Sequence, residues 1–170
     1  MRLWLIRHGA TDWSEEGRLC GWTDIPLSAQ GRSQARPLRP RLDGRVFEGV
    51  WTSDLTRASE FACLAAGRAE TDPRLREIDF GELEGRRWVD CDRSTRDALA
   101  GFDGFVAPGG ESVARLEERV GAFLASLRPG EHLLFTHGGV IRLLTQRVGL
   151  ASYPAPGELT IVEWADTDAE

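Results

Sequence analysis

The stretch MRLWLIRHG, residues 1–9, decides the fold because it joins a short apolar run to a polar turn. Residues 1–6 have the pattern of a buried strand, which ends on Arg7 and His8. These two residues place a permanent cation and an imidazole at the carboxyl edge of the strand. Gly9 then allows the backbone to turn sharply and to approach a ligand closely. Open α/β sheets bind their ligands at this edge, so we predict a ligand site here.

Strand-like and helix-like segments alternate along the rest of the chain, after a polar loop over residues 9–27. This alternation predicts a three-layer αβα fold, with a mostly parallel central sheet and helices on both faces. We find no internal repeat or linker and predict one domain over residues 1–170. The expected strands are 2–8, 46–52, 131–136 and 158–164, with an extended segment at 69–76. The expected helices begin at Ser28 (stopped or kinked by Pro37 and Pro40), at Ser53 or Asp54 (to about Ala66), at Arg86 (to Leu99), at Val113 (to Leu127) and at Val140 (to Val148).

The composition excludes several classes of protein. The net charge of −6 argues against a general nucleic-acid binder. All 21 cations are arginine, so neither a phosphate-loop lysine nor a Schiff-base lysine exists. The widely spaced Cys20, Cys63 and Cys91 are expected to be reduced thiols, and with only three histidines we expect no metal or other cofactor. No stretch has signal-peptide or transmembrane character, so we expect a cytoplasmic protein without a membrane partner.

Two further strands are followed by groups suited to an anion. Arg57 comes soon after the second strand, near the positive end of a new helix, and His137 directly follows the third. In a parallel sheet the loops after these strands share one edge with Arg7 and His8. The two guanidiniums and two imidazoles can therefore converge on a doubly charged tetrahedral anion. This arrangement is what phosphoryl transfer requires.

Phosphoryl transfer to an imidazole also needs a fixed nucleophile and an acid. A carbonyl at the Gly9 turn could fix the remote nitrogen of the attacking imidazole. The leaving alkoxide needs a proton, for which Glu77 is the candidate, with Asp79, Glu82 and Glu84 as competitors. Nearby arginines would lower the pKa of Glu77, whereas burial would raise it, and the sequence leaves this balance open. His132 opens a strand outside any motif and is expected to be structural.

The motifs together resemble the histidine phosphatase superfamily, in its phosphoglycerate mutase-like branch. The resemblance spans residues 2–144 in family order. It rests on four groups of residues: Arg7-His8-Gly9 with Trp13, Gly21, Asp24, Pro26, Leu27, Gly31, Gln34 and Ala35; Ser53-Asp54-Leu55 with Arg57-Ala58; Leu75, Glu77, Phe80-Gly81 and Glu84-Gly85; and Gly109-Gly110-Glu111-Ser112 with Thr136-His137-Gly138-Gly139.

The resemblance implies a role for each matching residue. His8 would be the nucleophile that becomes phosphohistidine, and Glu77 would be the general acid and then the base. No metal is implied. The phosphoryl oxygens would be held by Arg7, Arg57 and His137, with Ser14 and Gly138 as further phosphate-binding candidates.

Departures from the family pattern bear on the reaction. Ala10 replaces a frequent Glu, and Ser14 replaces an Asn that often contacts phosphate, so that contact is shorter or missing. Phe80 stands where glycolytic mutases carry Tyr, and residues 86–107 are shorter than the insertion that closes over a second phosphate in those enzymes. A short lid exposes a phosphoenzyme to water, which favours hydrolysis of a small phosphorylated metabolite. The opening strand also resembles the α-ribazole phosphatases.

Three other functions stay open at this point. They are a phosphoglycerate mutase, a protein-phosphohistidine phosphatase and a non-catalytic phosphate-binding module. The intact His8 and Glu77 argue against the last, since binding alone needs neither. The strand at 158–164 could pair across a homodimer. A second anionic group of the substrate could meet one of four arginines that otherwise form a solvated helix face: Arg86, Arg87, Arg93 and Arg96.

Overall fold

The structure, a computed structural model, describes residues 1–150 and 152–165. Its central sheet has five strands in the order β3-β2-β4-β1-β5. The strands β3, β2, β4 and β1 run parallel, and β5 pairs antiparallel with β1 at one edge. The mostly parallel sheet expected from the alternation of elements is therefore confirmed. The strands are β1 (Arg2–Arg7), β2 (Gly49–Thr52), β3 (Glu70–Thr71), β4 (Glu131–Thr136) and β5 (Leu159–Glu163).

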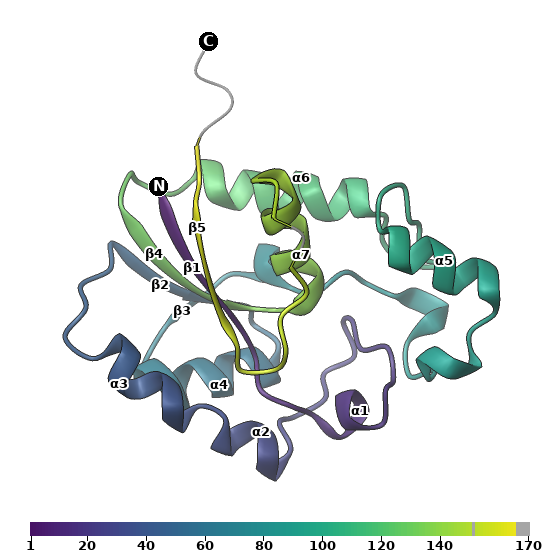
Figure 1. Ribbon diagram of the computed structural model, residues 1–170, viewed down its shortest axis with the longest axis horizontal. Helices are drawn as coiled ribbons and strands as arrows, with labels where there is room; N and C mark the ends of the chain where they lie inside the picture. Colours follow the sequence, from purple (N-terminus) through teal and green to yellow (C-terminus); the bar gives the residue numbers. More distant parts are fainter. Residues whose placement is uncertain (151, 166–170) are drawn as a thin grey trace.

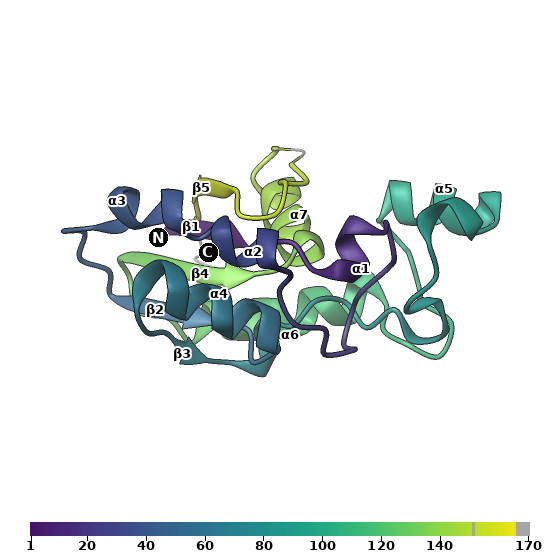
Figure 2. The same cartoon turned by 90° about the horizontal axis from the view of Figure 1, so that it is seen from below.

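Helices cover both faces of this sheet, as Figure 1 shows, with α6 and α7 on one side and α2, α3 and α4 on the other. The helix α5 lies at one end of the molecule near α1, away from the sheet (Figures 1 and 2). Within the described residues every helix is too short or too polar to span a membrane. The α-helices are α1 (Asp12–Glu15), α2 (Ala29–Ser33), α3 (Arg39–Leu42), α4 (Thr56–Ala66), α5 (Arg93–Gly101), α6 (Val113–Ala125) and α7 (Gly138–Arg147). The 3₁₀ helices are η1 (Arg36–Leu38), η2 (Pro73–Leu75), η3 (Gly81–Leu83) and η4 (Trp88–Asp90).

The core divides between the two faces because side chains alternate along a strand. In β1, Leu3 and Leu5 pack with the cluster under α6 and α7. Trp4 and Ile6 of the same strand pack with the cluster around α4. Every one of these positions is buried, which explains why the opening strand is a continuous apolar run rather than an alternating one.

The helix expected from Ser28 begins as predicted but breaks into three pieces. The Ser28 hydroxyl caps α2 by accepting a hydrogen bond from the Gly31 N–H, at 3.1 Å. Pro37 and Pro40 each lie near the start of a new turn, where a missing N–H costs nothing. The expected interruption of the helix therefore divides it into three short helices, α2, η1 and α3.

The predicted cap of α4 by Ser53 or Asp54 is wrong. The helix begins at Thr56, and the carboxylate that caps it belongs to Asp24 in a distant loop. Asp24 accepts hydrogen bonds from the Thr56 N–H at 2.8 Å and from the Thr56 hydroxyl at 2.7 Å. Asp54 instead forms an ion pair with Arg76. A cap supplied across 32 residues of chain leaves no local pattern in the sequence.

Other boundaries also differ from the expectations: α6 ends at Ala125 rather than Leu127, and α7 runs from Gly138 to Arg147 rather than from Val140 to Val148. The predicted helix from Arg86 to Leu99 is the short η4 followed by α5, and the loop at 9–27 contains α1. The extended segment at 69–76 is the short β3 followed by η2. The second strand starts at Gly49 because Val46 is exposed and has no sheet neighbour to pack against. The antiparallel edge strand β5 confirms the last expected strand, and pairing of a homodimer through it stays a prediction.

Candidate active site

The ends of the neighbouring strands β1 and β4 bring two imidazoles together. Arg7 is in register with Thr136, and the His8 N–H donates to the Thr136 carbonyl at 3.0 Å. The rings of His8 and His137, one residue further along each strand, have their centroids 5.0 Å apart. Both side chains are buried. Parallel pairing thus places two groups in contact that are far apart in the sequence.

The hydrogen bonds of His8 determine its tautomer. Its Nδ1 lies 2.7 Å from the Gly9 carbonyl oxygen, which can only accept. Its Nε2 receives a hydrogen bond from Nε of Arg57 at 3.3 Å, and a guanidinium can only donate. The proton of neutral His8 is therefore on Nδ1, and the lone pair of Nε2 faces the arginine. Burial, and then the positive charges of Arg57 and Arg7, hold the pKa of His8 well below its usual value, so the ring is neutral near pH 7.

Arg57 is fully buried and is held by the backbone of the loop before α2. Its guanidinium donates to the carbonyls of Gly21 at 2.6 Å and Thr23 at 3.1 Å. The same loop is tied down a second time by Glu84, which accepts hydrogen bonds from the N–H groups of Trp22 and Thr23. A buried cation with several fixed acceptors keeps one position, so its field acts at a constant place in the site.

Arg7 and His137 carry buried polar atoms without partners. Arg7 stacks over the Tyr153 ring at 4.9 Å and donates through Nη1 to the Pro154 carbonyl at 2.7 Å. Among the described residues, Nε of Arg7 and both ring nitrogens of His137 are buried without a hydrogen-bond partner. Burial and the charge of Arg57 hold the pKa of His137 well below its usual value. Nε1 of Trp51 and Nδ1 of His132 are also unpaired, but they lie outside this site. The unpaired atoms of Arg7 and His137 lie beside the His8 ring, where an anionic ligand could pair with them.

Glu77 is buried beside this cluster and accepts two backbone hydrogen bonds. The donors are the N–H of Gly139 at the start of α7, at 3.0 Å, and the N–H of Ile78, at 2.9 Å. Burial raises the pKa of Glu77, although these two bonds and the charges of Arg57 and Arg7 oppose the shift. The balance left open by the sequence is therefore decided by burial, which favours the protonated acid.

The three competing carboxylates have other surroundings. Asp79 accepts a hydrogen bond from the Gly81 N–H at 2.9 Å and is half-buried. Glu84 is engaged with the loop at residues 22–23, and Glu82 is exposed. Of the four candidates, Glu77 alone is buried with the two imidazoles nearby.

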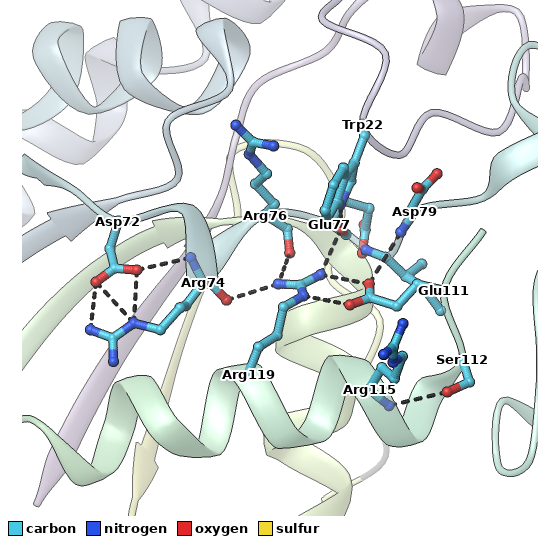
Figure 3. A network of polar contacts seen from close by, with 11 residues as sticks. Trp22, Asp72, Arg74, Arg76, Glu77, Asp79, Glu111, Ser112, Arg115 and Arg119 are labelled. Carbon is cyan, nitrogen blue, oxygen red and sulfur yellow. Dashed lines mark hydrogen bonds and ion pairs between the residues drawn. The ribbon is translucent and has the colours of Figure 1, made fainter.

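A partly buried ion pair, between Arg119 and Glu111, holds the backbone of the segment that carries Glu77 (Figure 3). Arg119 of α6 donates to the carbonyl of Glu77 at 2.8 Å and to that of Arg76 at 2.7 Å. Both carboxylate oxygens of Glu111 pair with Arg119, at 2.7 and 2.9 Å. Nε1 of Trp22 also donates to the Glu77 carbonyl, at 2.8 Å. The sequence singled out Glu111 only through its Gly-Gly-Glu-Ser motif, and nothing in it pointed to Arg119.

The remaining sequence-based candidates lie in different places. Ser14 bonds to the backbone of Thr11: its hydroxyl accepts from the N–H at 2.8 Å and donates to the carbonyl at 2.9 Å, so its only proton is already used. Gly138 begins α7, where an added Cβ would lie 2.8 Å from the Tyr153 ring. The arginines at 86, 87, 93 and 96 do not line the cavity beside Glu77. The sequence missed Arg142 and Tyr153, which do.

This cavity has a volume of about 460 Å³ and meets the acid and the start of α7 at Glu77 and Gly139. Among the described residues, no group of three or more His, Cys, Asp or Glu side chains is arranged to hold a metal ion. The site can therefore present to an anion a neutral imidazole, fixed cations and a carboxyl whose pKa is raised by burial. The adjoining cavity could hold the rest of a ligand that carries this anion.

Comparison with known proteins identifies the family of this chain. The family model of the histidine phosphatase superfamily (branch 1) matches residues 3–166, so the chain belongs to that superfamily. A curated relative named probable phosphoglycerate mutase GpmB, from Enterobacter sp. (strain 638), is 36% identical over 166 residues, which cover 90% of this chain and 77% of the relative.

Two solved structures are also similar. One is described as phosphoglycerate mutase from Thermus thermophilus, with a TM-score of 0.90 and 46% identity over 96% of this chain and 94% of that one. The other is described as a candidate alpha-ribazole-5'-P phosphatase from Escherichia coli str. K-12 substr. MG1655, with a TM-score of 0.75 and 31% identity over 88% and 80% of the two chains. These matches confirm the superfamily and the phosphoglycerate mutase-like fold expected from the sequence.

Proposed function

We propose that this protein is a metal-independent phosphomonoesterase, which hydrolyses a small phosphorylated metabolite through a phosphohistidine intermediate. The observation that carries the proposal is the fixed tautomer of His8. Nδ1 is held by the Gly9 carbonyl, which leaves the Nε2 lone pair beside Arg57. A non-catalytic phosphate site would need neither this nucleophile nor the buried acid Glu77.

In the first step, Nε2 of His8 attacks phosphorus and the bond from phosphorus to the ester oxygen breaks. Glu77 gives its proton to that oxygen, so an alcohol leaves rather than an alkoxide. The charge on the equatorial oxygens is stabilised by Arg7, Arg57 and His137, which supply fixed donors in a buried site. The raised pKa of Glu77 supports this role because it favours the protonated form that the step consumes.

In the second step, Glu77 is a carboxylate and takes a proton from water. The hydroxyl oxygen bonds to phosphorus while the nitrogen–phosphorus bond breaks. Inorganic phosphate leaves, His8 regains its lone pair, and Glu77 again carries a proton. No electron donor or acceptor is needed, and the balance of atoms is an ester plus water giving an alcohol and phosphate.

A phosphoglycerate mutase is the second candidate, because two of the similar proteins carry that name. A mutase must keep water from the phosphoenzyme and pass the phosphoryl group back to the sugar acid. The segment over residues 86–107 forms only η4 and α5 with their connections, and both lie at the end of the molecule beyond the sheet (Figure 1). This short lid supports hydrolysis, since water can reach the intermediate.

The deciding experiment follows phosphate release from a panel of esters with EDTA present. The panel contains 3-phosphoglycerate, 2,3-bisphosphoglycerate, α-ribazole phosphate, a phosphohistidine-containing protein and an aryl phosphate. Conversion of 3-phosphoglycerate to the 2-isomer is measured in parallel. We expect phosphate release without isomerisation and unaffected by EDTA. Isomerisation that depends on the bisphosphate, with little release, would identify a mutase and overturn the proposal.

A further inference from the structure

The cavity of about 460 Å³ beside Glu77 has walls that are apolar and aromatic on nearly every side. We propose that it binds the leaving group, and that the preferred substrates are phosphate monoesters of bulky, apolar alcohols rather than of small anionic acids. This inference rests on the proposed function and adds the substrate class to it. The apolar and aromatic side chains that line the cavity are Leu19, Phe80, Trp88, Leu99, Phe102 and Tyr153.

The position of the cavity follows from the chemistry of the acid. Glu77 must reach the ester oxygen to protonate it, so the group bonded to that oxygen lies on the same side as the carboxyl. Glu77 and Gly139 line the cavity, whereas Arg57, which contacts Nε2 of His8, does not line it. A phosphoryl group at His8 therefore directs its alcohol into this space.

The largely apolar walls of the cavity disfavour a second anion. Arg142 is the one cation among its described lining residues. Its guanidinium donates to the carbonyls of Leu99, at 3.0 Å, and Ala100, and it stacks over the Phe102 ring at 4.7 Å. These contacts use two of the five guanidinium N–H donors, and the stacking covers one face of the group. A carboxylate or second phosphate would lose its hydration against walls that are otherwise largely apolar, whereas an apolar group would not.

The backbone is strained at Phe102, which follows α5 and lines the cavity. Phe102 has a φ of 63° and is the one non-glycine residue with positive φ in the described part of the chain. Left-handed backbone is costly for a bulky side chain and tends to persist at ligand-binding sites. Here it places the aromatic ring in the cavity wall, beneath Arg142. The cavity volume is also in the range of pockets that enclose ligands of drug size.

The test compares alkyl esters whose alcohols differ in size and in charge. The substrates are 2-(1-naphthyl)ethyl phosphate, ethyl phosphate and 3-phosphoglycerate. Because apolar contacts in a pocket are worth about 10–200-fold per group, we expect kcat/KM to be at least about 100-fold higher for the naphthylethyl ester than for the other two. Equal values for the three esters, or a preference for 3-phosphoglycerate, would overturn the inference and leave the phosphatase assignment intact.

A matched pair of variants tests the cavity itself. Ala100 lines it and is exposed, so Ala100→Trp should fill the space without disturbing the core. Ala98 is an exposed residue of the same helix that does not line the cavity, and Ala98→Trp is the control. We expect Ala100→Trp to lower kcat/KM for the naphthylethyl ester about 10-fold or more relative to kcat/KM for ethyl phosphate, with no effect of the control. An equal effect of Ala100→Trp on both esters would contradict the assignment.

Binding of phosphonates separates this inference from the proposed reaction, because phosphonates are not hydrolysed. Calorimetry should give a Kd for 2-(1-naphthyl)ethylphosphonate at least about 10-fold lower than for ethylphosphonate. If this preference is found while no ester is hydrolysed, the cavity assignment holds and the proposed reaction fails. If the two phosphonates bind equally, the cavity assignment fails whatever the reaction.

Discussion

The two halves of the candidate site are built in different ways. The phosphate half lies at the ends of β1 and β4 and the start of α4, where backbone pairing and backbone acceptors hold His8 and Arg57. The leaving-group half is a cavity whose walls come from η4, α5, the start of α7 and several loops, outside the sheet. Charge that must act at one place is thus supported by the rigid sheet. Shape that selects a substrate is provided by peripheral segments, which can vary without loss of the fold.

Glu77 lies at the boundary between these halves. Its carboxyl is bonded to the start of α7, its backbone is bonded to α6, and its side chain lines the cavity. We therefore predict that substitutions in the phosphate half abolish turnover of every ester. Substitutions that affect Glu77 should slow esters with poor leaving groups more than esters with good ones, because only the former depend strongly on an acid.

The largest effect is expected for His8. His8→Ala removes the nucleophile and should reduce phosphate release by roughly 10⁵-fold or more for every ester, while phosphate still binds to the remaining cations. Phosphate release and calorimetric phosphate binding measure the two outcomes. The control is His132→Gln, which alters a buried histidine on β4 that bonds to the Arg128 carbonyl. That variant should lose stability and keep its chemistry. Retained turnover in His8→Ala would remove His8 from the nucleophilic role.

The next effect concerns the acid. Glu77→Gln preserves the shape of the side chain but supplies no acidic proton, so hydrolysis of an alkyl phosphate should fall by about 10²–10⁴-fold. An aryl phosphate with a good leaving group should be affected far less in the first step. Pre-steady-state release of the two alcohols measures this difference. Asp79→Asn is the matched control at the competing carboxylate. Equal losses for both esters would count against Glu77 as the acid.

A smaller effect is expected when the acid is only displaced. A Cβ added at Gly139 would lie 2.2 Å from Oε1 of Glu77, and the end of this side chain can move away. Gly139→Ala should therefore fold but lose about 10²-fold in kcat for alkyl esters, because a misplaced acid donates poorly. Gly121→Ala, in α6, meets no atom within 4 Å and should raise stability by about 0.5–1 kcal/mol without changing activity. If the two variants have the same activity, the position of the Glu77 carboxyl does not limit the reaction.

A smaller loss of activity is expected for variants of Arg119. This residue positions the Glu77 segment and does not contact the substrate. Lysine keeps the charge but cannot bond to Glu111 and to the backbone carbonyls at the same time. Arg119→Lys should lower kcat for alkyl esters about 10-fold, with KM almost unchanged and aryl esters less affected. Arg115→Lys, at an exposed position of the same helix, is the control. A uniform loss for all esters would indicate a role in stability alone.

The smallest effect is the pH dependence of stability. The pKa of His137 is lowered by burial from its ordinary value of 6.5, so the unfolded chain binds more protons than the folded one below that pH. Above pH 6.5 the neutral His137 costs the folded state nothing. As the pH falls below 6.5, protonation of His137 in the unfolded chain lowers the free energy of unfolding. The raised pKa of Glu77 acts in the opposite direction from pH 4.5 upward. Urea unfolding at pH 7, 6 and 5 should show a slope for His137→Gln that is shallower by up to about 1.4 kcal/mol per pH unit. Parallel slopes would show that His137 is not held neutral.

Much of the phosphate half was predictable from the chain because it depends on regular features. An apolar run marks a buried strand, and the residue that follows a parallel strand lies at a shared edge. Arg7, His8 and His137 could be placed together on these grounds, and the structure has the two imidazoles in contact. Family motifs extended this placement to Glu77. The apolar stripe from Val113 likewise predicted α6, because helical spacing is itself a local property.

The tertiary structure decided what depends on contacts between distant segments. The cap of α4 by Asp24, the hold of Arg119 on the Glu77 backbone and the position of Arg142 beside α5 join residues that no periodic pattern relates. The pKa of Glu77 also required the fold, because burial and nearby charge oppose each other and only their distances decide which dominates. The positions and ends of the main strands are thus set by local hydrophobic pattern. Hydrogen-bond partners, desolvation and the shape of the cavity arise only when the loops pack together.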